Sequence, residues 1–284
     1  KVNFKLYIMK TILVPVDFSE YSEYALEVAA SIAKNNAANI VVVHMLGLSN
    51  AFLSKDEAEE VFNAIYYMKL SKKKFKEFLN KPYLKNIEVT ETIKNYKVFT
   101  EINELANEFQ ADLIVMGSHG VTGFSDVFIG SNTEKVVRTS EIPVLVIKEK
   151  MKDFNIKRAI FVTDLELESS EAYVKTRDFL LNFECKLELL YIKLPEYFQS
   201  TDEINEKYSK FLNATGLNEL DFPTINYYDE YSLESGVFNY CKKNDTDVII
   251  IPTHGRRGLS HFFYGSFGED IANHSNIPVI TIKI

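Results

Sequence analysis

Short runs of consecutive apolar residues, many of them β-branched, alternate along this chain with longer segments in which apolar residues recur at helical spacing. The first half predicts strands at residues 11–16, 40–44, 87–93, 113–116 and 144–147, and helices at 21–34, 56–79, 101–109 and 132–139. The second half predicts strands near 158–163, 187–192, 224–228, 248–251 and 279–282, with helices between them. This alternation predicts right-handed βαβ crossovers and parallel sheets covered on both faces.

The two halves are copies of one unit. At an offset of 135, residues 112–148 align with 247–283 without a gap and share 16 of 37 residues. Unrelated sequences of this composition would share about two or three. The sequence therefore predicts two tandem five-stranded, doubly wound α/β domains, at 9–149 and 156–284, with ligands beyond the carboxyl ends of the strands.

Composition narrows the class of protein. The 284 residues include 32 Lys and Arg against 40 Asp and Glu, a net charge of −8. This balance argues against broad binding to nucleic acid or anionic membranes, because both need basic patches that neutralise phosphates. Two cysteines, Cys185 and Cys241, are too few for a disulfide framework or a zinc site. No apolar run approaches the roughly 20 residues that span a bilayer, so the sequence predicts a cytoplasmic protein.

The first copy carries a glycine-rich connection between a buried strand and a helix. Gly117, Gly120 and Gly130 permit close approach of the backbone to a ligand. Ser131 and Glu134 have the spacing of a capping box, and the free N–H groups at such a helix start attract an anion. The connection is thus predicted to bind a phosphate chain, or else it is an ordinary loop that happens to be rich in glycine.

Asp17 follows the first predicted strand, and Ser19 after it can cap the next helix. A carboxylate at a strand end can accept hydrogen bonds from a ribose hydroxyl or an adenine amino group. The alternative is an acid that only interacts with the helix dipole.

These segments resemble the universal stress protein family in its tandem two-domain form. The start Lys10-Thr-Ile-Leu-Val-Pro-Val-Asp17 resembles the first strand of the family and its acid. Residues 117–132 match the ATP-binding pattern Gly-x2-Gly-x9-Gly followed by Ser, Thr or Asn, and 142–147 resemble the last strand.

The resemblance implies an ATP-binding subgroup, with Mg²⁺ accompanying the nucleotide. It implies that the adenosine end and the phosphates are held by Pro15, Val16, Asp17, Met45, Gly117, Gly120, Gly130, Ser131 and Asn132. It also implies that the last strands, at 144–147 and 279–282, pair antiparallel as an intramolecular pseudo-dimer, or between copies in a homo-oligomer.

The second copy departs from the pattern. Pro252 replaces the first glycine, and a proline has no N–H and a fixed φ. Asp164 is kept, but Leu-Glu-Leu follows it in place of Phe-Ser. Arg256 and Arg257 could bind phosphate instead, or be solvated loop cations. We expect one strong ATP site in the first domain and a degenerate second domain.

The expected function is that of an ATP-binding regulatory protein of the stress response, in which the ligand orders the loop and alters a surface. A slow ATPase is an alternative, because no general base or arginine finger for efficient phosphoryl transfer is evident. A scaffold that works without nucleotide is another.

Overall fold

The computed structural model describes residues 9–45, 57–94, 101–118, 131–253 and 275–284, with only the backbone at 57–64, 131 and 132. The strands are β1 Thr11–Val16, β2 Asn39–Met45, β3 Val89–Lys94, β4 Leu113–Gly117, β5 Val144–Ile147, β6 Arg158–Val162, β7 Lys186–Lys193, β8 Ile225–Asp229, β9 Val248–Thr253 and β10 Val279–Lys283. The α-helices are α1 Glu20–Asn36, α2 Glu57–Phe78, α3 Ile102–Glu108, α4 Ser131–Thr139, α5 Leu167–Leu180, α6 Thr201–Thr215 and α7 Leu233–Lys243. All predicted strands are present, with bounds within two residues of those expected.

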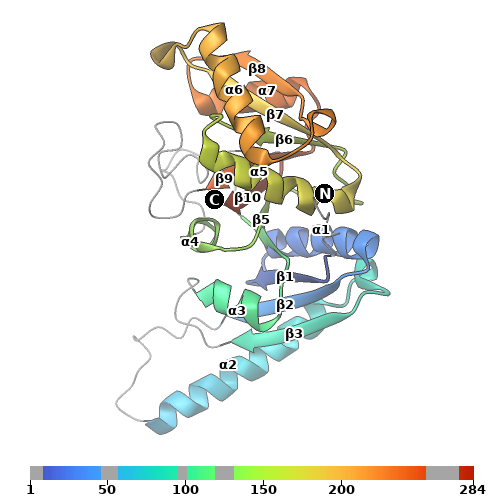
Figure 1. The fold of residues 1–284 in the computed structure, drawn as a ribbon. Coiled ribbons are helices and arrows are strands. Elements are labelled where there is room, and N and C mark those ends of the chain that lie inside the picture. The colour runs from blue at the N-terminus through green and yellow to red at the C-terminus, as the bar shows by residue number, and fades with distance from the viewer. Residues whose placement is uncertain (1–8, 46–56, 95–100, 119–130, 254–274) are drawn as a thin grey trace.

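The described strands form one sheet of ten, in the order β3-β2-β1-β4-β5-β10-β9-β6-β7-β8. Each half contributes five parallel strands, and the halves meet where β5 pairs antiparallel with β10 (Figure 1). Leu145 lies opposite Ile280, with Val146 opposite Val279 and Val144 opposite Thr281. The predicted α/β fold and the pairing of the last strands within one chain are confirmed.

Alternate residues of the central strands face two layers of helices. One apolar core joins the sheet to α1, α2, α5 and α6, and the other joins it to α3, α4 and α7. In β1, for example, Val14 belongs to the first core and Leu13 to the second, and both are fully buried. Continuous apolar runs such as these are what a parallel sheet covered on both faces requires.

Local signals set the helix starts. The Ser19 side chain accepts a hydrogen bond from the Ser22 N–H and so caps α1, as the sequence predicts. Ser200 and Glu203 form a full capping box at α6, which ends at Gly216 in the left-handed conformation. In the described part of the chain, no helix is long and apolar enough to cross a membrane.

Candidate functional site

The candidate site of the first half lies where the chain changes direction across the sheet. From β1 the chain passes to β2 and β3 on one side and then returns to β4 and β5 on the other. Pairing of β1 with β2 continues to Val16, whereas its register with β4 covers only Ile12 and Leu13. Pro15 lies beyond that register, where its missing N–H leaves no bond to β4 unmade. In open α/β sheets this switch point, at the carboxyl ends of the strands, is where ligands bind.

Asp17 is exposed at this point, and its Oδ1 atom is held from one side. Oδ1 accepts hydrogen bonds from the Ser19 N–H at 2.9 Å and from the Ser22 hydroxyl, while the Asp17 N–H donates to Ser22 Oγ at 3.1 Å. Partial burial acts to raise the pKa of Asp17, but the hydrogen bonds from Ser19 and Ser22 outweigh it and lower the pKa. The side chain is therefore an ionised acceptor, fixed by the first turn of α1.

Phe18 gives the turn its shape. Its φ of 67° lies in the left-handed region, which is uncommon for a residue with a side chain. The Phe18 ring packs 4.5 Å from the ring of His44 and 5.0 Å from that of Phe75, which ties the turn to β2 and α2. This aromatic cluster fixes the position of the Asp17 backbone.

The end of β2 completes this side of the site. His44 Nδ1 donates to the Val16 carbonyl oxygen at 2.8 Å, and burial lowers the pKa of the ring, so His44 is held neutral. Met45 is the last residue of β2 and is half-buried. The structure thus places Val16 and Met45 at the ends of adjacent strands, and the His44 ring is hydrogen-bonded to Val16.

Gly117 ends β4 directly against α1. A Cβ atom on Gly117 would lie 2.2 Å from the Tyr21 carbonyl oxygen and 2.9 Å from the Ser22 nitrogen. This packing requires a glycine whether or not a ligand approaches it. The contact also brings the end of β4 to the same turn of α1 that holds Asp17. Thr133 in α4 donates to the Gly117 carbonyl oxygen at 3.4 Å, which brings the start of α4 to the same place.

The rest of the predicted phosphate loop is only partly described. Gly120 and Gly130 lie outside the described residues. Helix α4 begins at Ser131, so Ser131 and Asn132 are its first two residues. The helix thus starts one residue earlier than the predicted range of 132–139.

Lys148 lies beside the start of this loop. Gly117 is paired with Ile147 in the sheet, and the Ser118 N–H donates to the Ile147 carbonyl oxygen at 2.9 Å. Lys148 follows on the same strand end and is 8% exposed, and its Nζ atom has no hydrogen-bond partner among the described residues. Burial lowers its pKa to about 8.

The second half keeps the turn but buries its acid. Leu165 has a φ of 63°, as Phe18 does, and Asp164 Oδ1 accepts from the Glu166 N–H at 3.1 Å and the Ser169 hydroxyl at 3.2 Å. Asp164 is only 2% exposed, and no described residue hydrogen-bonds to its buried Oδ2 atom. Glu166 replaces Ser19 before the helix and makes no side-chain cap. The same turn therefore buries the Asp164 carboxylate, and the exposed carboxylate here is that of Glu166.

Sequence reasoning missed Ser22, His44 and Lys148. Ser22 could have been found, because Ser169 is its counterpart at the same offset of 147 that relates Asp17 to Asp164. The burial of Lys148 and the ring contact of His44 depend on distant segments and have no local signal. Among the described residues, no three His, Cys, Asp or Glu side chains come together as a metal site.

Sequence comparison identifies relatives of each half and of the whole. The profile of the universal stress protein family matches residues 9–148 and 230–283. Universal stress protein MJ0577 of Methanocaldococcus jannaschii is 32% identical over 167 residues, covering 50% of this chain and 96% of that protein. Universal stress protein Slr1230 of Synechocystis is 22% identical and covers 97% of this chain and 100% of that protein. One relative thus corresponds in length to a single copy and the other to both.

Solved structures share the whole fold. A universal stress protein from Archaeoglobus fulgidus superposes with a TM-score of 0.66 at 17% identity, covering 98% of this chain and 99% of that chain. The functionally unknown protein PA1789 from Pseudomonas aeruginosa gives a TM-score of 0.59 at 15% identity, over 97% and 92% of the chains. Because the family profile covers more than half of the residues, this chain belongs to the universal stress protein family.

Proposed function

We propose that the first half binds ATP and that the protein is a nucleotide-responsive regulator in the stress response. The observation that carries the proposal is the placement of Asp17. It is an exposed, ionised carboxylate at the end of β1, held by Ser19 and Ser22 at the switch point of the sheet. The end of β4 at Gly117 and the start of α4 lie against the same turn.

Each part of this arrangement suits one part of the nucleotide. A carboxylate accepts hydrogen bonds from ribose hydroxyls, which are donors. The ends of β1 and β2, at Pro15, Val16 and Met45, offer backbone groups to adenine. The helix start at Ser131 and Asn132, with Gly120 and Gly130 before it, suits the phosphates, because the first N–H groups of a helix are unpaired and carry partial positive charge. Mg²⁺ would arrive with the phosphates and neutralise part of their charge.

The second half lacks these features. Asp164 is buried, Glu166 adds a negative charge where Ser19 stands in the first half, and Pro252 occupies the position of Gly117. We therefore expect one nucleotide per chain, and we assign the regulatory response to ordering of the loop that follows β4 in the first half.

Calorimetric titration of the ligand-free chain with MgATP tests the proposal. One ATP is expected per chain. Asp17→Asn should weaken binding about tenfold or more, because hydrogen bonds to a charged group contribute about 1.5–3 kcal/mol. Asparagine keeps the Oδ1 acceptor that Ser19 and Ser22 use, so the turn should persist. Gly130→Asp adds a second, repulsive test at the phosphates.

Asp164→Asn is the matched control and should leave ATP affinity unchanged. Two ATP molecules per chain, or equal losses from Asp17→Asn and Asp164→Asn, would overturn the assignment to one half. ATP turnover is expected below about one per second; a higher rate, in the range of ordinary enzymes, would favour an ATPase instead.

A further inference from the structure

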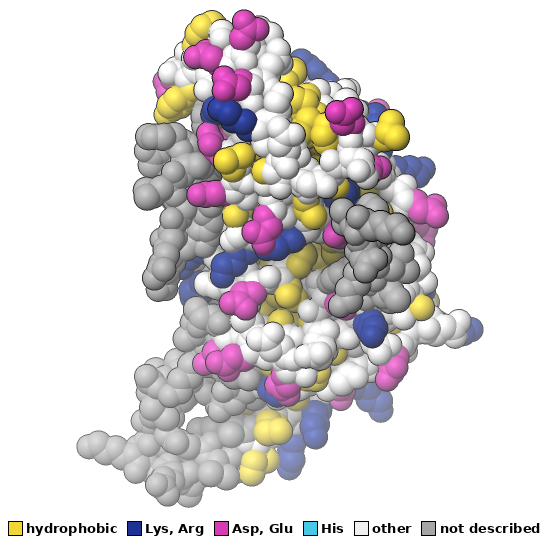
Figure 2. All heavy atoms as spheres, viewed as in Figure 1, with side chains coloured by type: hydrophobic (Ala, Val, Ile, Leu, Met, Phe, Trp, Pro, Cys, Tyr) yellow, Lys and Arg dark blue, Asp and Glu magenta, His cyan; other side chains and the backbone are white. Residues whose placement is uncertain are grey.

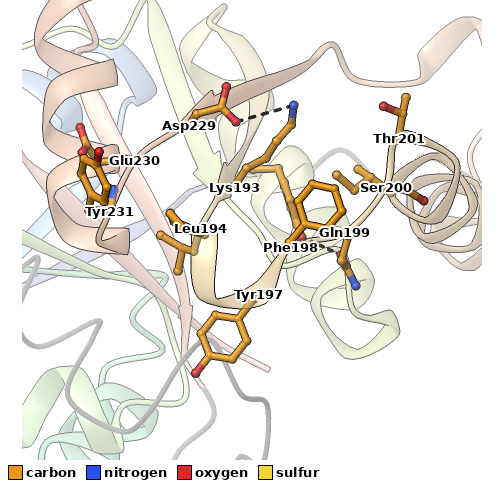
Figure 3. A pocket seen from close by; sticks show the side chains of 13 residues that line it. Lys193, Leu194, Tyr197, Phe198, Gln199, Ser200, Thr201, Asp229, Glu230 and Tyr231 are labelled. Carbon is orange, nitrogen blue, oxygen red and sulfur yellow. Dashed lines mark hydrogen bonds and ion pairs between the residues drawn. The ribbon is translucent and has the colours of Figure 1, made fainter.

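A pocket of about 460 Å³ opens at the carboxyl ends of β7 and β8 in the second half. Its walls are the connection 194–200, the first turn of α6 and the segment Asp229 to Tyr231 after β8 (Figure 3). The strands of the two halves run in opposite directions, since β5 and β10 are antiparallel. The carboxyl ends of the strands in the two halves therefore point in opposite directions, and the pocket and Asp17 lie on opposite sides of the sheet along the strand direction. Its volume is in the range of sites for small molecules.

Most residues that line the pocket lie outside the segments that the family profile matches. Its lining residues at 191–204 and Asp229 fall between the two segments that the family profile matches. The connection 194–200 is also shorter than its counterpart 46–56 in the first half. Most of the wall thus lies outside the segments that the family profile matches.

Aromatic rings line the mouth of the pocket. Phe198 is 84% exposed and Tyr231 is 89% exposed, and they stand on opposite sides of it (Figure 3). Tyr191 lies beneath them, 2% exposed, and its hydroxyl donates to Gln199 Oε1 at 2.9 Å. The connection that carries Phe198 is thereby fastened to β7. Two exposed rings at the mouth of one pocket are available to pack against a ligand.

The charge at the pocket is negative. Among the described residues that line it, the acids are Asp229 and Glu230 and the one cation is Lys193. Glu230 accepts hydrogen bonds from the Tyr231 N–H and from Asn239 Nδ2, both at 3.0 Å, and these bonds lower its pKa. The surroundings are also acidic: residues 156–284 contain 20 Asp and Glu against 13 Lys and Arg. On the face shown in Figure 2, acidic side chains stand beside exposed hydrophobic ones over this half.

The contacts of Lys193 show that this wall stabilises an ammonium group. Its Nζ atom lies 5.4 Å from the centre of the Tyr227 ring and 3.9 Å from Asp229 Oδ1. An ammonium between an aromatic face and a carboxylate is stabilised by the ring quadrupole and by the opposite charge. One such cation is already in place. Each Glu230 oxygen accepts one hydrogen bond and keeps a second lone pair, which is available to another cation beside the rings of Phe198 and Tyr231.

We propose that this pocket binds a small organic cation, a substituted ammonium group carried on an apolar or aromatic body. The apolar body packs against Phe198 and Tyr231, and the ammonium faces Asp229 and Glu230. An anionic ligand such as a nucleotide would meet two carboxylates against one ammonium, so the pocket is distinct in chemistry as well as in position from the proposed ATP site.

The test uses benzyltrimethylammonium as the probe, titrated by calorimetry or NMR into the full chain, with benzoate as the anionic comparator. The cation should bind and benzoate should bind at least tenfold more weakly. Phe198→Ala and Glu230→Gln should each weaken the cation about threefold to thirtyfold, the size of one cation–π or charge contact. Tyr66→Ala, which removes an exposed ring of α2 outside the pocket, is the control and should have no effect.

Lys193→Gln gives the sharpest outcome. It removes the competing ammonium and frees Asp229, so the cation should bind several-fold more tightly. Weaker cation binding in Lys193→Gln, tighter binding of benzoate than of the cation, or no effect of Phe198→Ala would overturn the proposal. Phe198 is exposed, so an unchanged melting temperature should confirm that the variant is folded. Saturating MgATP should leave the affinity for the probe unchanged, whereas competition would place the nucleotide in this pocket and overturn the assignment.

Discussion

At the scale of single residues, the two halves differ in what they expose rather than in what they contain. Asp17 and Asp164 follow equivalent strands, accept a hydrogen bond from an equivalent serine, and precede a left-handed residue. One carboxylate is exposed and the other is buried. The sequence identified both acids, but their exposure depends on distant segments that pack around the turn. Residue type and spacing therefore predicted where the two acids lie in the chain. Which of the two carboxylates solvent can reach was known only from the folded structure.

Lys148 provides a prediction at this scale. Its folded pKa of about 8 lies below the ordinary 10.5, so the unfolded chain binds more protons between these values, and stability should rise with pH across that window. Below about pH 8 the buried ammonium is charged in both states and its full cost is present. Lys148→Met should then stabilise the fold by up to about 3 kcal/mol.

The measurement is chemical denaturation of wild type and variant at pH 7 and pH 10. The advantage of Lys148→Met should shrink at the higher pH. Lys283→Met is the matched control, because Lys283 is the repeat counterpart of Lys148 and is less buried. A variant that is less stable than the wild type at pH 7 would show that Lys148 has a partner that stabilises its charge.

At the scale of elements, the apolar pattern predicted the central strands, because a strand covered on both faces must be apolar along its length. The edge strands β3 and β8 also hold polar residues and were predicted from their β-branched and aromatic residues. The sequence pattern could not predict what happens where elements meet. The sequence suggested that Gly117 is a glycine for the sake of a ligand, yet the structure provides a packing reason at α1. In the β7–α6 connection Phe198 is 84% exposed, which no local pattern in the sequence indicates. Contacts between elements distant in sequence decide both cases.

The contact between β4 and α1 gives a prediction for these elements. Gly117→Ala would place a methyl group 2.2 Å from the Tyr21 carbonyl oxygen, so α1 must shift from the sheet. We expect a loss of about 3 kcal/mol in the free energy of unfolding, as for overpacking in a rigid core.

Gly216→Ala is the control for this substitution. Gly216 ends α6 with a φ of 65° and has open space around it, so a methyl group there strains the backbone without a clash. The expected loss is about 1 kcal/mol. Equal losses in the two variants would mean that close packing at Gly117 is not what requires the glycine.

At the scale of the whole molecule, the join between β5 and β10 has internal symmetry. Leu145 and Ile280 are repeat counterparts and lie opposite each other, and Val144 and Val146 pair with the counterparts of one another. Because repeat counterparts lie opposite each other, β5 could pair antiparallel with the β5 strand of a second copy in the same register. We propose that the boundary between the two domains lies between residues 149 and 156. Each domain, when produced alone, would then expose its last strand, β5 or β10.

A fragment of residues 9–152 should therefore form a homodimer through β5. Light scattering should give twice the fragment mass, and adding a fragment of residues 156–284 should convert it into a one-to-one complex. A folded fragment that stays monomeric at all concentrations would contradict the symmetry argument.

The position of β10 in the chain also has a consequence for synthesis. β5 ends at Ile147 and its partner begins at Val279, about 130 residues later. At typical rates of translation, the first half waits on the order of ten seconds for that partner. During this interval the ribosome-bound chain carries the unpaired, wholly apolar edge Val144–Ile147, which can pair with a neighbouring nascent chain. Crowding of ribosomes on the message is thus the condition under which this fold is most exposed to misassembly.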